Sequence, residues 1–217
     1  MRTRPRAIRD AAATRQRILA AATDEFARYG FAGARVDRIS RRARTFDRMI
    51  YYYYGDKVGL FRVVLENVYE DLWRAEEALR LSGVAPEAGM RELVAFTWNY
   101  YVAHPEFIRL LNSENLQRGN NVKRSKRVGR LSSPFIDTLR DLLRRGAAKG
   151  VFRRGVDPVR LYLTIAALGY FYVANRYTLT NFLAFDLMAP RNRESWLRHI
   201  TDLVLDSIRP RKPLRRR

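Results

Sequence analysis

Apolar residues recur along almost the whole chain at the three- and four-residue spacing of amphipathic helices, and the alternation typical of strands is absent. A first helix is expected over about 14–29, where Thr14 would cap its start and Gly30 would end it. Its apolar face comprises Ile18, Leu19, Ala22, Phe26 and Ala27. The pattern predicts an all-α protein.

Two short helices are expected next, over 36–43 and about 47–54, joined by the tight turn of Arg44, Thr45 and Phe46. Two helices packed across so short a turn form a helix-turn-helix, whose second helix can enter a DNA major groove. The residues expected to pack the two helices together are Val36, Ile39, Ser40 and Ile50.

A long helix is expected over about 57–80, after the break at Gly55 and Asp56. Beyond it, prolines mark helix starts, because a proline at the first helical position removes no intrahelical hydrogen bond. These prolines are Pro86, Pro105, Pro134, Pro158 and Pro190. The polar, basic stretch 120–130 is expected to be a surface loop. The sequence therefore predicts a three-helix N-terminal helix-turn-helix domain followed by a six-helix domain.

The segment 157–176 is apolar on nearly every side, whereas the last helix, 191–208, has one apolar stripe. That stripe comprises Trp196, Leu197, Ile200, Leu203, Val204 and Ile208. A helix that is apolar all round needs cover on more sides than a small domain supplies. We expect one side of 157–176 to face the core and the other to face a second copy of the chain, in a homodimer formed through 157–176 and 191–208. The alternative is a central helix in a monomeric bundle.

The 217 residues have a formal net charge of +20, which predicts a polyanionic partner: DNA, RNA or an anionic membrane surface. Basic residues gather at both ends. The first 17 residues hold six arginines against Asp10 alone, and the last nine hold six basic residues and no acid. The arm 1–12 is expected to be flexible, and either solvated or in contact with phosphates or a minor groove. The tail 209–217 is expected to be solvated and disordered.

Composition argues against several other classes of protein. There is no cysteine, and the only histidines are His104 and His199, so neither a metal site nor a cofactor is expected. No Ser–His–Asp set or Gly-rich phosphate loop is present, which argues against an enzyme. The start lacks the apolar core of a secretory signal, and the uncharged run 161–175 is shorter than the ~20 residues that span a bilayer. We expect a soluble, cytoplasmic protein associated with the nucleoid and not with a membrane.

Three stretches of the first ~70 residues are distinctive: TRQRIL from Thr14, YGF from Tyr29, and IYYYYGDK from Ile50 running into Leu60 and Phe61. In these stretches the chain resembles the tetracycline-repressor (TetR) family of bacterial transcription regulators. A patch at 104–125 resembles a ligand-domain variant of some members. The resemblance implies a DNA-binding domain over 1–56, a ligand-binding and dimerisation domain over 57–208, and a tail over 209–217.

The turn departs from the family pattern. Arg44 stands where glycine is usual, so either the turn differs or Arg44 accepts a left-handed conformation that costs about 1–2 kcal/mol. Phe46 stands where Ser or Asn usually caps the recognition helix, so the cap is expected to shift to Thr45 or Asp47.

The turn and the recognition helix supply most of the expected DNA contacts. Arg48 is the best candidate for reading a guanine edge or holding a phosphate. Four successive tyrosines cannot share one helix face, so we expect Tyr51 and Tyr52 to point outward and Tyr53 or Tyr54 to pack inward. Lys57 opens the next helix, where an anion is favoured. The full set of candidates is Thr14, Arg35, Arg38, Arg44, Thr45, Phe46, Asp47, Arg48, Met49, Tyr51, Tyr52 and Lys57.

The resemblance further implies a homodimer whose two recognition helices sit about one DNA turn, ~34–36 Å, apart on a palindromic operator in double-stranded DNA. A small-molecule effector would bind the second domain, shift the connecting helix and release the operator. Candidate effector contacts are Trp98, Tyr101, Phe107, Asn112, Glu114, Asn115, Tyr170, Tyr172 and Asn175, a lining suited to a small aromatic or heterocyclic molecule. Two alternatives remain: a sequence-nonspecific architectural nucleic-acid-binding protein, and membrane-surface binding by the basic ends.

Overall fold

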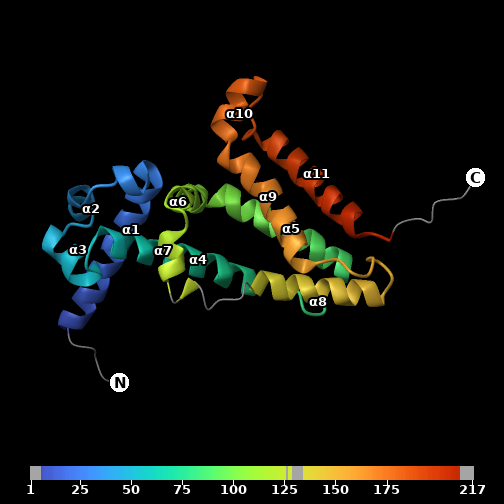
Figure 1. Cartoon of the computed structure of the whole chain (residues 1–217), viewed down its shortest axis with the longest axis horizontal. Coiled ribbons are helices and arrows are strands. Elements are labelled where there is room, and N and C mark those ends of the chain that lie inside the picture. Colours follow the sequence, from blue (N-terminus) through green and yellow to red (C-terminus); the bar gives the residue numbers. More distant parts are fainter. Residues whose placement is uncertain (1–5, 126, 129–133, 211–217) are drawn as a thin grey trace, which may run out of the picture. The chain divides into compact units, whose positions relative to one another are not determined.

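The computed structural model describes residues 6–125, 127–128 and 134–210, and these residues form helices and no strand (Figure 1). The helices are α1 (Arg6–Gly33), α2 (Val36–Arg42), α3 (Asp47–Tyr54), α4 (Lys57–Glu77), α5 (Pro86–Ala103), α6 (Pro105–Leu116), α7 (Asn120–Arg124), α8 (Pro134–Ala148), α9 (Pro158–Ala174), α10 (Arg176–Leu183) and α11 (Pro190–Ile208). The all-α prediction is confirmed, and five helices start at the prolines that the sequence marks. No described helix combines the length and apolarity needed to cross a bilayer.

The chain divides into two compact units. The first unit contains α1–α3, α4 as far as Asp71, and α6 and α7. The second contains the end of α4 from Leu72, together with α5 and α8–α11. The division therefore falls inside α4, and two helices from the middle of the sequence join the N-terminal ones.

Helix α1 differs from its prediction at the start and agrees at the end. It begins at Arg6, so part of the expected arm 1–12 is helical, while residues 1–5 lie outside the described residues. Thr14 is inside the helix, where its Oγ1 donates to the Asp10 carbonyl at 2.8 Å, so its expected role as N-cap is wrong. Gly30 breaks the helical path with φ 66° and ψ 177°, as its expected role as a stop requires.

The expected loop over 120–130 is wrong in its first part, which forms helix α7. The Glu114 carboxylate accepts hydrogen bonds from the backbone N–H of Asn121 at 2.8 Å and of Val122 at 2.9 Å, and from Nδ2 of Asn121 at 2.8 Å. Because the first N–H groups of a helix lack intrahelical partners, this side chain stabilises the start of α7. Residues 126, 129 and 130 lie outside the described residues.

The core of the first unit is a phenylalanine cluster. The ring centroid of Phe61 lies 4.8 Å from that of Phe26 and 5.2 Å from that of Phe31. Burying one such side chain contributes roughly 1.5–3 kcal/mol. Ser113 of α6 joins the cluster to the middle of the sequence, because its Oγ accepts a 2.8 Å hydrogen bond from the Phe31 backbone N–H.

Helix α5 is the centre of the second unit and packs against α8, α9 and α11. Small residues allow the close approach: a Cβ at Gly89 would lie 2.6 Å from Leu142 Cδ2 of α8, and one at Gly169 of α9 would lie 3.0 Å from Tyr101 Cδ2. Helix α9 buries one face only, with Leu161, Ile165, Gly169, Tyr172 and Val173 inward. The prediction that one side of this segment faces the core is confirmed.

Two details of the C-terminal helices differ from the sequence pattern. Leu203 of α11, which is expected on the inward stripe, is 45% exposed, and Leu205 is buried in its place. The short helix α10, none of whose residues is buried, is not among the helices that the sequence pattern predicts.

Glu76, near the end of α4, has a buried oxygen, Oε2, without a hydrogen-bond partner. Burial, followed by repulsion from Glu77, raises the pKa of Glu76 from 4.5 to about 7. The charge of Glu76 also adds to the effect of burial in raising the pKa of Tyr162 on α9. The folded protein therefore holds a proton on Glu76 that the unfolded chain releases at lower pH.

Stability is predicted to fall as pH rises from about 4.5 to about 7, because over this interval the folded state binds more protons than the unfolded state. Glu76→Gln should remove this dependence and raise the free energy of unfolding near pH 8 by up to about 3 kcal/mol. Urea denaturation on both sides of the interval measures the effect. Glu92→Gln, at an exposed site on α5, is the matched control. If Glu76→Gln and Glu92→Gln showed the same pH dependence as the natural protein, the assignment to Glu76 would be contradicted.

Candidate DNA-binding site

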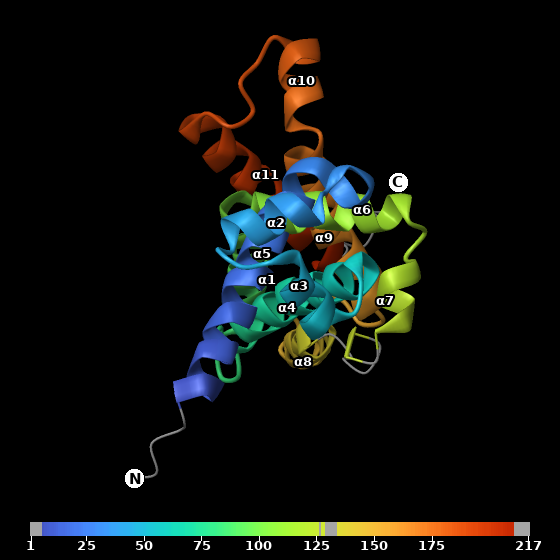
Figure 2. The same cartoon turned by 90° about the vertical axis from the view of Figure 1, so that its left-hand side faces the viewer.

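Helices α2 and α3 pack across a turn of four residues, 43–46, and form the expected helix-turn-helix (Figure 2). Ile39 of α2 and Ile50 of α3 are both 0% exposed, and Ser40 is buried between the helices. The turn is closed by a 3.0 Å hydrogen bond from the Thr45 N–H to the Ser40 carbonyl. The Ser40 hydroxyl also donates to the carboxylate of Asp47, so one small residue fixes both sides of the turn.

The structure of the turn shows which conformation Arg44 adopts and which residue is the N-cap of α3. Arg44 adopts the left-handed conformation with φ 51°, which costs a non-glycine residue about 1–2 kcal/mol. Phe46 is the N-cap residue of α3, in extended conformation and without a side-chain cap hydrogen bond. The expected shift of the cap to Thr45 or Asp47 is wrong, because α3 begins at Asp47 and Phe46 occupies the N-cap position.

Side chains of α1 hold both ends of α2. At its start, Glu25 is 1% exposed and its Oε1 accepts from the Arg35 N–H at 3.0 Å and from Arg38 Nε at 2.6 Å. At its end, Arg17 Nε donates to the Ala43 carbonyl at 3.1 Å. These bonds satisfy backbone groups that have no partner inside α2. Sequence reasoning missed Glu25, although it follows Ile18 and Ala22 at the spacing of the buried face of α1.

The four tyrosines of α3 divide as predicted. Tyr51 and Tyr52 are 50% and 77% exposed. Tyr53 lies beneath the Arg15 guanidinium, 4.7 Å from ring centroid to Cζ. The Tyr54 hydroxyl donates to the Arg15 carbonyl at 3.0 Å, and burial raises the pKa of Tyr54. The inner pair thus anchors α3 on α1 and leaves the outer pair free to meet a partner.

The turn and α3 present a mixed cationic and aromatic surface. Phe46 is 70% exposed, and the Arg48 guanidinium lies over its ring, 5.3 Å from Cζ to the ring centroid. Arg44, Asp47 and Arg48 are exposed, whereas Thr45 and Met49 are half-buried. Eight of the predicted contacts therefore lie together: Arg44, Thr45, Phe46, Asp47, Arg48, Met49, Tyr51 and Tyr52.

The other predicted DNA contacts are held by contacts within the chain. Arg38 pairs with Glu25 and covers the Tyr29 ring at 4.3 Å, and Arg35 pairs with Asp37, which lowers the pKa of that carboxyl. Thr14 Oγ1 accepts a 3.0 Å hydrogen bond from Arg17.

Lys57 is the first residue of α4. Its Nζ lies 3.4 Å from the Ala32 carbonyl and 5.0 Å from the centre of the Phe31 ring, and burial lowers its pKa. Arg41 and Arg42, which are not among the candidates from the sequence, are exposed in the last turn of α2, where Arg41 pairs with Asp37 and Arg42 with Asp24.

The predicted effector contacts fall in both units. Trp98 and Tyr172 meet in the second unit, with ring centroids 5.2 Å apart, and Tyr101 packs beside Gly169. Tyr170 and Asn175 are half-buried on and beside α9. In the first unit, Glu114 caps α7, and Phe107 packs edge-on against Tyr69 at 5.7 Å. Also there, Asn112 is half-buried and Asn115 exposed. Among the described residues, no group of three His, Asp or Glu side chains is placed to hold a metal ion.

A helix-turn-helix that packs on α1 and is followed by a larger helical unit is the architecture of one-component DNA-binding regulators. Comparison of the chain with known protein families identifies which family it belongs to. Residues 18–64 match the family model for bacterial regulatory proteins of the tetR family, and residues 86–204 match that for the tetracycline-repressor-like C-terminal domain. The chain belongs to the TetR family.

Two curated relatives are HTH-type transcriptional repressors. NicS of Pseudomonas putida is 45% identical over 211 residues, which cover 96% of this chain and 100% of NicS. SCO4008 of Streptomyces coelicolor is 42% identical over 113 residues, covering 52% of this chain and 55% of SCO4008. Among solved structures, the putative regulator SCO4942 of Streptomyces coelicolor aligns with TM-score 0.67 and 26% identity over 91% of this chain and 99% of its own. The chain is accordingly a DNA-binding transcription regulator and not an enzyme.

Arg44→Gly is predicted to raise the free energy of unfolding by roughly 0.5–1 kcal/mol, because relief of the left-handed strain exceeds the entropic cost of glycine. The matched control is Arg41→Gly in helical α2, where the same change should destabilise by about 1 kcal/mol. Thermal and urea unfolding of both variants provide the measurement. Equal destabilisation by the two substitutions would show that Arg44 is not strained.

Proposed function

We propose that the protein is a homodimeric repressor that binds a palindromic operator through α3 and leaves it when a small molecule binds the second unit. The observation that carries this proposal is the exposed side-chain set of Arg48, Tyr51 and Tyr52 on the second helix of a helix-turn-helix. NicS, which aligns over its full length and is named a repressor, supports repression rather than activation. Such a protein acts on the chromosome, in the nucleoid.

DNA recognition would combine three kinds of contact. Arg48 can donate two hydrogen bonds to a guanine edge, which discriminates by about 1–3 kcal/mol against other bases. The hydroxyls of Tyr51 and Tyr52 suit phosphate oxygens, and the Phe46 ring suits a thymine methyl group. Arg41 and Arg44 add positive charge beside α3, which favours the phosphate backbone in a salt-dependent way.

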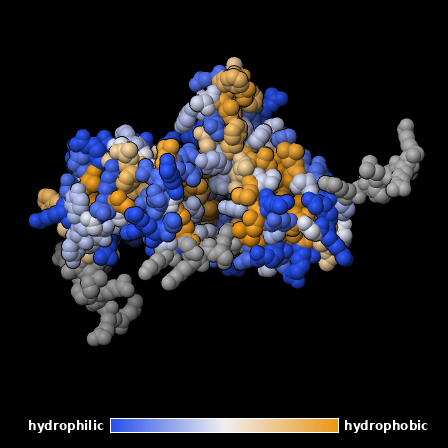
Figure 3. Space-filling view, viewed as in Figure 1, coloured by the Kyte–Doolittle hydropathy of each residue, from blue (hydrophilic) through white to orange (hydrophobic). Residues whose placement is uncertain are grey.

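The outer face of α9 supports the homodimer. Val159, Leu163 and Phe171 are 46%, 59% and 58% exposed, and Leu203 of α11 is 45% exposed. The space-filling view shows hydrophobic residues gathered over this part of the second unit (Figure 3). Exposed apolar area of this kind marks an interaction surface, and a two-fold axis matches a palindrome.

Release by an effector requires that the ligand bind one spacing of the two α3 helices more tightly than another. Helix α4 is the covalent route for this coupling, because it begins directly after the helix-turn-helix and continues into the second unit. A ligand that moves the end of α4 would change the position of α3 in each protomer.

Selection of bound sequences from random DNA should enrich one palindrome. The Arg48→Ala and Tyr52→Ala variants should bind this palindrome at least ~10-fold more weakly than the natural protein, because each loses base or phosphate contacts. Arg154→Ala, at an exposed site of the second unit, is the control for lost charge and should bind normally. Circular dichroism checks that the variants fold. Equal binding of the palindrome and scrambled DNA would instead favour the architectural alternative.

Leu163→Glu and Phe171→Glu are predicted to convert the dimer to a monomer, because a charge placed inside an apolar interface loses its hydration. Leu116→Glu, an 84% exposed site on α6 outside this face, should stay dimeric. Sedimentation velocity at micromolar concentration distinguishes the species. Dimers in all three variants would place the interface elsewhere.

A further inference from the structure

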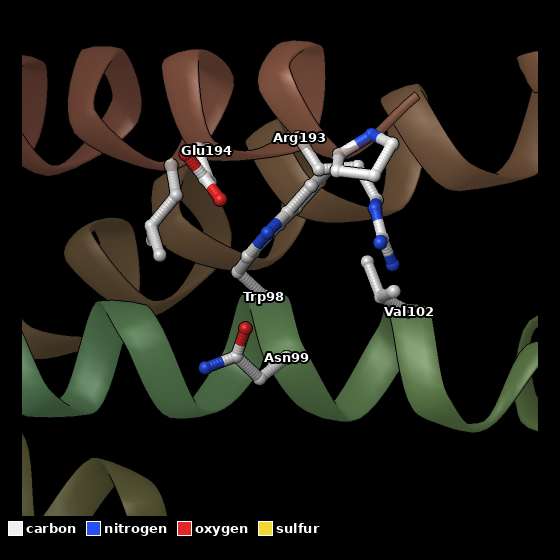
Figure 4. A pocket seen from close by; sticks show the side chains of 7 residues that line it. Trp98, Asn99, Val102, Arg193 and Glu194 are labelled. Carbon is white, nitrogen blue, oxygen red and sulfur yellow. The ribbon is translucent and has the colours of Figure 1, made fainter. Parts of the chain in front are cut away.

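A cavity of about 230 Å³ lies between α5 and α11 in the second unit. Trp98, Asn99 and Val102 line it from α5, and four residues line it from the start of α11: Pro190, Arg193, Glu194 and Leu197 (Figure 4). Only Trp98 belongs to the effector contacts expected from the sequence. The space corresponds to roughly eight water molecules at ~30 Å³ each, enough for a small organic molecule.

Arg193 is the chemically unusual member of this lining. Its Nε is buried without a hydrogen-bond partner, and the only other described side-chain N or O atom in that condition is Glu76 Oε2. Buried donors in folded proteins are nearly always hydrogen-bonded, so the unpaired Nε indicates that the site lacks an acceptor. Because the guanidinium is always charged and presents its N–H groups in a planar fork, the acceptor that fits it best is a carboxylate.

The rest of the lining favours a carboxylate with a flat or apolar body. Trp98 is 2% exposed and is held by the edge of the Tyr172 ring, so its indole is a fixed wall. Val102, Pro190 and Leu197 supply apolar surface, and the amide of Asn99 adds a donor and an acceptor at the open side.

Charge in the cavity excludes the more highly charged anions. Arg193 is the only cation in the lining, and Glu194 contributes a negative charge. In Figure 4, Glu194 and the Arg193 guanidinium lie on opposite sides of the Trp98 ring, so a single carboxylate can meet Arg193 without abutting Glu194. A phosphate dianion would need more donors than this lining offers.

We propose that this cavity binds a small organic monocarboxylate, with the carboxylate on Arg193 and its carbon skeleton against Trp98. The proposal rests on the proposed function in one respect, that the ligand is the effector which releases DNA. Binding to the protein alone and release of DNA are separate measurements, so either part can fail without the other.

The binding test uses benzoate, and benzamide as its neutral analogue of the same shape, in calorimetric and NMR titrations of the DNA-free protein. Benzoate should bind at least ~10-fold more tightly than benzamide and shift the Trp98 indole N–H signal. Arg193→Gln should abolish this preference, Arg193→Lys should keep part of it, and Arg198→Gln, an exposed arginine on α11, should leave it unchanged.

Absence of benzoate binding, equal binding of the amide, or natural affinity in folded Arg193→Gln would overturn the site. Benzoate that binds through Arg193 and lowers operator affinity supports both proposals. Benzoate that binds through Arg193 and leaves operator affinity unchanged supports the carboxylate site and contradicts its role in DNA release.

Discussion

The buried carboxylate of Glu25 is the interaction on which the orientation of the helix-turn-helix depends. A carboxylate at 1% exposure is stable only when it is paired and hydrogen-bonded, and here it accepts from a backbone N–H at the start of α2 and from the Arg38 guanidinium. Either donor alone would leave a buried charge partly unsatisfied. Glu25 therefore fixes α2 on α1, and the contacts of α2 with α3 then determine which side chains of α3 face outward.

The contacts on either side of Glu25 make this arrangement rigid. Arg17 holds the end of α2, Ser40 joins α2 to Asp47 of α3, and the inner tyrosines hold α3 on α1. Further contacts tie distant segments to the same unit: Ser113 accepts from the Phe31 N–H, Ser125 donates to Glu66 of α4, and Arg127 forms an ion pair with Glu66. The strained backbone at Arg44 is tolerated because the surrounding hydrogen bonds and packing contacts hold the turn in a single conformation.

Much of this architecture could be predicted from the sequence, because it depends on local signals. Helical periodicity located the long helices, prolines marked five helix starts, and the 100° rotation per residue divided the four tyrosines correctly. Features set by distant partners could not be predicted. The α3 helix begins at Asp47, whose carboxylate accepts from Ser40 of α2, and α7 forms because Glu114 supplies an acceptor for its first N–H groups. The unpaired Nε of Arg193 is visible only once α5 and α11 are packed together.

Genome-wide mapping of the DNA bound by the intact protein in its own cells tests most directly whether α3 reads sequence. The proposed homodimer predicts a small number of discrete sites that share an inverted repeat, with half-sites about one helical turn, ~34–36 Å, apart. Occupancy at these sites should disappear in Arg48→Ala while the protein remains folded and present. Broad occupancy that follows DNA abundance, unchanged in Arg48→Ala, would contradict sequence-specific recognition and leave only the charge of +20 to explain binding.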